Sequence, residues 1–155
     1  MRGKKAPKRT VSPDPKYGST AVGRFINYVM LDGKKATAQK VVYDALEKLE
    51  KKSEKPALEA FEEAIKNISP MLEVKSRRVG GANYQIPMQV RADRRQQLAF
   101  RWLIAATRAK KGKAMSDRLA EELLAATNNQ GDAVKKKQDV QRMAEANRAF
   151  AHFAY

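Results

Sequence analysis

Arginine and lysine side chains are the groups of this sequence best suited to chemistry, and they gather around one glycine pair. The basic residues on either side of Gly80-Gly81 are Lys75, Arg77, Arg78, Arg91, Arg94 and Arg95. A guanidinium donates paired hydrogen bonds to phosphate and stacks on bases. Glycine lets a backbone approach a ligand closely. This segment is therefore typical of a ribbon that inserts into a nucleic-acid groove. The alternative is an edge strand whose basic side chains are simply solvated.

Tyr84 follows the glycine pair by three residues. A tyrosine in such a place could stack on an unpaired base, as aromatic side chains do in proteins that bind single-stranded RNA. The alternative of equal weight is that Tyr84 packs at the base of the ribbon.

A second basic pattern recurs every seven residues, at Arg94, Arg101 and Arg108. On a helix these positions drift by only about 20° per step, so the three arginines share one face. That face lies beside the apolar face of Leu98 and Trp102. The helix can pack inward and bind phosphate outward, although a merely solvated exterior gives the same pattern.

Lysines also occur where two helices are expected to begin, at Lys34-Lys35 and at Lys135-Lys136-Lys137. A cation at a helix N-terminus opposes the helix dipole by up to about 1 kcal/mol. A bound phosphate would offset that cost, since helix N-termini bind anions. The alternative for the second group is that Asp139, in the next turn, offsets the lysines.

The elements that position these groups follow from hydrophobic periodicity. Apolar residues three and four apart predict helices at about 20–30, from the lysine pair to about 52, between Pro56 and Pro70, at 92–109, at 115–127 and from about Lys135. Two short extended runs over about 72–90, parted by the glycine pair, predict a hairpin. We therefore expect a mainly α fold, a six-helix bundle with one protruding two-stranded antiparallel β-hairpin between the third and fourth helices.

Charge is the strongest signal in the composition. The 155 residues contain 32 Lys and Arg against 17 Asp and Glu, a formal net charge of +15. Such an excess opposes compaction unless a polyanion offsets it, and nucleic acid is the first candidate, an anionic membrane surface the second. We expect residues 1–18 to form a basic tail, disordered when free, with little of it buried. Residues 19–153 are expected to form a single helical RNA-binding domain, and 154–155 the C-terminal end.

Several classes of function find no support. The sequence has no cysteine, and no apolar run is long enough to span a membrane. The only histidine, His152, lies near the chain end, in a region expected to fray. Glu121 and Glu122 are expected to be ordinary groups of a surface helix that point to different faces. We find no catalytic constellation, metal site or cofactor motif, so we do not expect an enzyme.

Four stretches of the chain resemble one family, the bacterial-type small-subunit ribosomal protein seven. They are residues 71–87 (MLEVKSRRVGGANYQIP), 25–35 (FINYVMLDGKK) continuing into 41–44, 94–103 (RRQQLAFRWL) and 131–148. The resemblance covers most of residues 17–153, and the hairpin motif is long and specific.

This resemblance implies a structural protein that binds the 3′ major domain of small-subunit rRNA and nucleates assembly of the subunit head. It also implies a ribbon near the exit-site tRNA and the mRNA exit path, neighbouring ribosomal proteins nine and eleven, and a cytoplasmic ribosome. The residues expected to face rRNA are Lys4, Lys5, Lys8, Arg9, Lys34, Lys35, Lys75, Arg77, Arg78, Arg94, Arg95, Arg101, Arg108, Lys135, Lys136 and Lys137. Those expected near tRNA and mRNA are Arg78, Gly80, Gly81, Asn83 and Tyr84.

Two other readings compete with an RNA-binding structural protein. An architectural DNA-binding protein could place the ribbon in a minor groove, but such arms carry an apolar or proline wedge. Here the tip is Gly80-Gly81-Ala82-Asn83, which cannot wedge base pairs apart. A hydrolase would need a catalytic constellation that the sequence does not offer.

Overall fold

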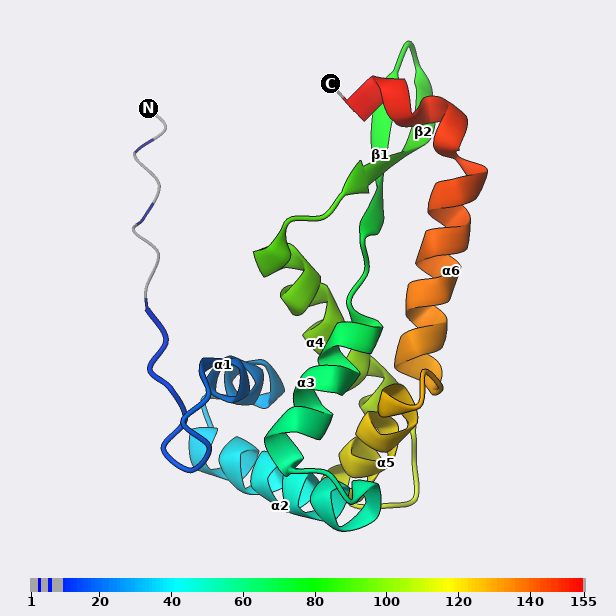
Figure 1. The fold of residues 1–155 in the computed structure, drawn as a ribbon. Coiled ribbons are helices and arrows are strands. Elements are labelled where there is room, and N and C mark those ends of the chain that lie inside the picture. The colour runs from blue at the N-terminus through cyan, green and yellow to red at the C-terminus, as the bar shows by residue number, and fades with distance from the viewer. Residues whose placement is uncertain (1–2, 4–5, 7–9, 155) are drawn as a thin grey trace.

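Helices and a hairpin follow one another along the chain in the predicted order (Figure 1). The computed structural model describes all residues except 1–2, 4–5, 7–9 and 155. Within them the helices are α1 (Thr20–Val29), α2 (Lys35–Ser53), α3 (Ala57–Ile68), α4 (Ala92–Ala109), α5 (Met115–Thr127), α6 (Asp132–Ala146) and the 3₁₀ helix η1 (Arg148–Ala154). The strands β1 (Leu72–Val79) and β2 (Ala82–Gln89) lie between α3 and α4. The predicted fold class is confirmed.

Three phenylalanines form the centre of the core. Phe25 of α1 lies 5.4 Å from Phe61 of α3 and 5.2 Å from Phe100 of α4, measured between ring centroids. All three side chains are at most 1% exposed. Phe100 was not predicted to lie on the inner face of α4. That helix packs against α1, α3, α5 and α6, so its buried surface is wider than a single stripe.

The hairpin is as predicted, with Val79 paired to Ala82 and Leu72 to Gln89. Gly80 and Gly81 form the two-residue loop at φ 58° and 91°. Positive φ at both loop positions is the type I′ geometry that matches the twist of paired strands, and glycine reaches it without a Cβ clash.

The C-terminal segment covers one end of the hairpin, where η1 crosses the strands (Figure 1). The ring of Tyr84 lies 5.1 Å from that of Phe150 and 5.3 Å from that of Phe153. Our expectation that the chain frays around His152 is therefore wrong. The two phenylalanines give η1 an apolar surface to bury, and a lone two-stranded ribbon needs such cover.

The end of the predicted tail is packed on the helices rather than solvated. Asp14 is 3% exposed; its carboxylate accepts bonds from the backbone N–H groups of Lys16 and Tyr17 and from the Tyr43 hydroxyl at 2.7 Å. A Cβ on Gly23 would lie 3.0 Å from the Ser12 carbonyl oxygen, which shows how closely the segment crosses α1. Asp14 is the one buried residue among those described in 1–18, so the expectation that little of this stretch is buried holds for them. Lys4, Lys5, Lys8 and Arg9 lie outside the described residues.

The start of α6 differs from the prediction in a way that changes its chemistry. The helix begins at Asp132, so Lys135 to Lys137 lie beyond its first three residues. The N–H of Ala133 donates to Oε1 of Glu122 at 2.9 Å, and the Lys110 ammonium donates to Oε2 at 2.5 Å. Glu122 is fully buried, so its assignment to a surface helix is wrong. A carboxylate from within the chain thus occupies the place where we had expected a phosphate.

Gly131, the residue before α6, gives a first testable prediction. Its φ is 94°, and an added Cβ would lie 2.8 Å from Oε1 of Glu122. Gly112 has a similar φ of 87° with nothing within 4 Å. Backbone strain alone costs about 1–3 kcal/mol, so Gly112→Ala measures strain and Gly131→Ala measures strain plus a displaced carboxylate. Urea denaturation should show the larger loss of unfolding free energy for Gly131→Ala; equal losses would contradict the packing described here.

Candidate nucleic-acid interface

The base of the hairpin and the start of α4 share a cluster of basic side chains. The carboxylate of Glu73 on β1 lies 3.2 Å from the Lys75 ammonium and 3.3 Å from Nε of Arg94. The Nε–H of Arg95 donates to the Val90 carbonyl at 2.9 Å. No bond within the described residues engages the terminal nitrogens of either arginine. The anchoring bonds therefore fix the two side chains while their forked ends stay available to a phosphate.

Further along the ribbon, Arg77 donates to the Phe153 carbonyl of η1 at 2.9 Å, and Arg78 is exposed. Gly80, Gly81 and Asn83 at the tip are also exposed. Tyr84 is half-buried against two phenylalanines, which favours its interpretation as a packing residue. The tip is thus a polar, unobstructed backbone turn.

A second group lies where α1 meets α2, near the end of α4. Lys34 precedes α2 and Lys35 is its first residue, and the first turn contains no acidic residue. Arg108 donates to the carbonyl oxygen of Val29, the last residue of α1, at 3.2 Å. Arg101 lies between the two groups on α4 and is exposed. Helix α4 therefore links the hairpin cluster to the α1–α2 junction through its arginine stripe.

The lysines of α6 form a third group. Lys137 donates to the Asn67 carbonyl at the end of α3, at 2.8 Å, while Lys135 and Lys136 are exposed. No bond described here joins them to the other two groups. The structure thus brings together the hairpin and α4 residues and leaves the α6 lysines as a separate basic face.

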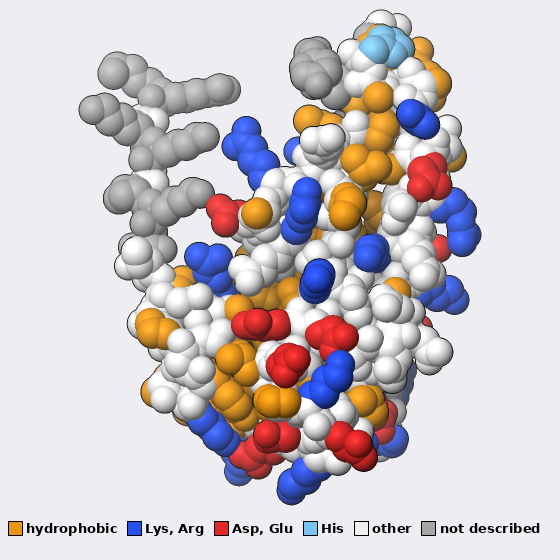
Figure 2. All heavy atoms as spheres, viewed as in Figure 1, with side chains coloured by type: hydrophobic (Ala, Val, Ile, Leu, Met, Phe, Trp, Pro, Cys, Tyr) orange, Lys and Arg blue, Asp and Glu red, His pale blue; other side chains and the backbone are white. Residues whose placement is uncertain are grey.

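Carboxylates pair with a different set of lysines. The pairs are Lys16–Glu47, Lys48–Asp117, Lys55–Glu63, Lys110–Glu122 and Lys113–Glu121. On the face shown in Figure 2, acidic side chains gather in the lower half, where α2 and α3 lie. Twelve of the predicted rRNA-facing residues are described. Only two of them, Lys75 and Arg94, form an ion pair with another described residue, and both pair with Glu73.

Several of these ion pairs shift the pKa of a member toward its charged form. The hydrogen bond with Glu47 raises the pKa of Lys16, and the same bond lowers the pKa of Glu47. The bond from Lys113 likewise lowers the pKa of Glu121, and the bond from Lys48 lowers that of Asp117. The charge of such cations is offset by a neighbouring carboxylate, whereas at the hairpin and on α4 only Lys75 and Arg94 of the described interface cations have such a partner.

One exposed cation beside the α4 stripe was not predicted from the sequence. Arg24 on α1 donates from Nη1 to the Gln96 side-chain oxygen on α4 at 3.1 Å. The one signal in the sequence that could have indicated Arg24 as an interface residue is its position on the outward side of the helix. Among the described residues, no helix is apolar over a membrane's thickness, and no three His, Cys, Asp or Glu side chains gather as metal ligands.

Comparisons with known proteins agree on one family. The family model described as "Ribosomal protein S7p/S5e" matches residues 1–148. The chain is 54% identical to a Thermotoga petrophila protein over 155 residues, all of both chains. It is 55% identical to a Moorella thermoacetica protein over 151 residues, 97% of each, and 56% identical to an Alkaliphilus oremlandii protein over 149 residues, 96% of each. All three relatives bear the name small ribosomal subunit protein uS7.

Proposed function

This chain belongs to the ribosomal protein S7p/S5e family, and on that premise we propose that it binds the 3′ major domain of small-subunit rRNA and nucleates assembly of the subunit head. As a family member it is a structural, non-enzymatic component of the small ribosomal subunit. One observation carries the finer proposal: the cations of the hairpin, the α4 stripe and the α1–α2 junction have one carboxylate partner among the described residues, Glu73.

The mechanism is electrostatic and geometric. Basic side chains displace counterions condensed on the phosphates, and this release drives binding. The anchored arginines of α4 present forked ends that match phosphate oxygens. Specificity comes from the shape of RNA junctions and from splayed bases, because the major groove of A-form RNA is too deep and narrow to read.

We further propose that the hairpin tip lies near the exit-site tRNA and the outgoing mRNA, in a cytoplasmic ribosome. The exposed, uncharged Gly80-Gly81 turn beside Arg78 supports this placement, since backbone there can approach a ligand closely. Ribosomal proteins nine and eleven are the proposed protein neighbours, on the family resemblance alone.

A competition experiment separates this function from an architectural DNA-binding one. Labelled 3′ major-domain transcript is held on filters by the full chain at fixed salt, and unlabelled RNA junction or duplex DNA is added. We expect the folded RNA to compete far better than the duplex. Equal competition by duplex DNA would favour the minor-groove alternative and overturn the RNA assignment.

Removing two ribbon charges tests the proposed site directly. Arg77→Ala combined with Arg78→Ala should weaken binding of the transcript about tenfold or more, since a hydrogen bond to a charged group contributes about 1.5–3 kcal/mol. The helical core should stay folded, because both side chains are exposed on β1.

The matched control removes the same charge from paired lysines, Lys55→Ala with Lys113→Ala, and should change the affinity little. Filter binding gives the affinity and a circular-dichroism melt the fold. A melt that shows the arginine double variant to be unfolded would contradict the claim that the ribbon charges are dispensable for folding.

A further inference from the structure

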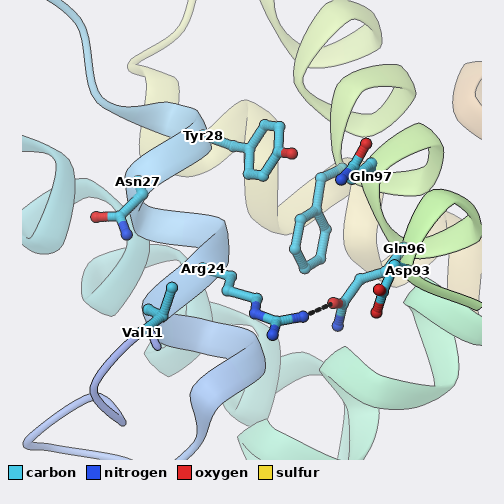
Figure 3. A pocket seen from close by; sticks show the side chains of 8 residues that line it. Val11, Arg24, Asn27, Tyr28, Asp93, Gln96 and Gln97 are labelled. Atoms are coloured by element: carbon cyan, nitrogen blue, oxygen red, sulfur yellow. Dashed lines mark hydrogen bonds between the residues drawn. The ribbon is translucent and has the colours of Figure 1, made fainter. Parts of the chain in front are cut away.

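A hollow with polar and aromatic walls lies between α1 and α4 (Figure 3). Its volume is ≈ 370 Å³, within the range of small-ligand sites, roughly 300–1,000 Å³. In Figure 3 Arg24 reaches from α1 toward Gln96 on α4, whereas Asn27 points away from them. The side chains that line the hollow do not belong to the three basic groups described above, so the hollow is a separate candidate site.

Two aromatic rings form the apolar part of the hollow. Phe100 is 1% exposed, and its ring lies 5.6 Å from that of Tyr28 at an interplanar angle of 61°. Tyr28 is half-buried. The hollow thus opens to solvent with Phe100 buried behind its wall, and Tyr28 supplies the accessible aromatic surface on which a flat ring can lie.

Hydrogen-bonding groups form the other part. Gln96 accepts a bond from Arg24 through its oxygen, and no bond within the described residues uses its amide N–H groups. Gln97 on the same helix lines the hollow, and its side chain forms no hydrogen bond to another described residue. Each amide offers donors and an acceptor, which is the mixed pattern that the edge of a nucleobase requires.

Other ligands fit this lining less well. Arg24 is the one cation among the described lining residues, so a phosphate would meet a single positive side chain there. A neutral, flat group with both donors and acceptors suits the aromatic and amide walls. On α4, Gln97 lies three residues after Arg94 and four before Arg101, so it is on the face of the arginine stripe. A strand whose phosphates bind that stripe therefore passes beside the hollow.

We propose that this hollow binds one unpaired nucleobase that the folded RNA extrudes. The ring of the base lies against Tyr28, and the base edge bonds to the amides of Gln96 and Gln97. This inference rests on the proposed function, because it needs the arginine stripe to bind the RNA backbone.

The salt dependence of binding tests the proposal. The probe is the 3′ major-domain transcript, bound by the full chain at several salt concentrations. Gln97→Ala should weaken binding about two- to tenfold at every concentration, the range expected for one hydrogen bond, and Tyr28→Leu about fivefold or more, for lost stacking. Neither should change the slope of log affinity against log salt, since neither removes a phosphate contact. Arg101→Ala should lower that slope by about 1.

The control is Gln141→Ala, the same substitution on α6, which should leave affinity unchanged. Chemical probing of the Watson–Crick edges adds a second readout: an unpaired base protected by the wild type should become reactive again with Gln97→Ala. If Gln97→Ala changes neither the affinity for the transcript nor the protection of the unpaired base, the base site is overturned and the proposed function stays intact. A wild type that binds no transcript at any salt would overturn both. If the Tyr28→Leu variant does not fold, the result for Gln97→Ala decides whether the base site exists, because that variant keeps both aromatic rings.

Discussion

Raising the salt concentration from about 50 to about 200 mM should weaken the binding of this protein to the 3′ major-domain transcript by on the order of 10³ to 10⁵. A protein that neutralises roughly 6 to 10 phosphates loses this much, because salt restores the counterions that binding released. The structure describes twelve basic residues of the predicted interface, of which only Lys75 and Arg94 form ion pairs with described carboxylates. Ten cations without such partners are enough for that number of contacts.

Filter binding at five or more salt concentrations gives the slope of log affinity against log salt. The paired-lysine variant Lys55→Ala with Lys113→Ala serves as its control, since these charges already have carboxylate partners. Its slope should match that of the wild type. A wild-type affinity that barely responds to salt would show that burial of apolar surface, and not phosphate neutralisation, drives the interaction.

The helices and the hairpin could be predicted because their signals are local. The apolar spacing of Val22, Phe25, Ile26 and Val29 predicts α1, and all four side chains are buried. Gly80-Gly81 predicts the turn, because both residues need positive φ. In each case residues close in the sequence determine the geometry, so pattern alone is sufficient.

Features that depend on distant partners escaped prediction. Phe150 and Phe153 of η1 pack on the ring of Tyr84, which lies far back in the chain. Asp14 is buried because Tyr43 donates to it. The residues of the proposed interface were predicted from charge and spacing. Their anchoring bonds, such as Arg94 to Glu73 and Arg108 to Val29, were not, since helical periodicity does not say what a side chain meets.

Glu122 is the strongest example of such a distant dependence. It lies on α5, yet it binds the backbone at the start of α6 and the Lys110 ammonium after α4. Its side chain is fully buried, so the carboxylate replaces water with two protein partners. In the sequence it stands next to Glu121, which pairs with Lys113 at the surface. Nothing local distinguishes the two residues, but the fold assigns them different roles.

We expect Glu122→Ala to lower the free energy of unfolding by about 3–5 kcal/mol, the loss typical when one partner of a buried ion pair is removed. For a chain of this size that is a fall in melting temperature of roughly 6–20 °C. The substitution leaves a cavity, an unbonded N–H at Ala133 and a Lys110 ammonium without its carboxylate. Glu122→Gln keeps an acceptor for Ala133, and Lys110 is 33% exposed, so water screens part of the lost pairing and the effect should be smaller.

Glu121→Ala is the matched control, since an exposed ion pair contributes only about 0–1 kcal/mol. Urea denaturation followed by circular dichroism measures all three variants. Equal losses for Glu121→Ala and Glu122→Ala would mean that the buried carboxylate does not hold α6. Because α6 packs along β1, a loosened α6 should also let the hairpin shift. Glu122→Ala should therefore bind the transcript more weakly than Glu121→Ala even at temperatures where both are folded, although neither residue faces the RNA.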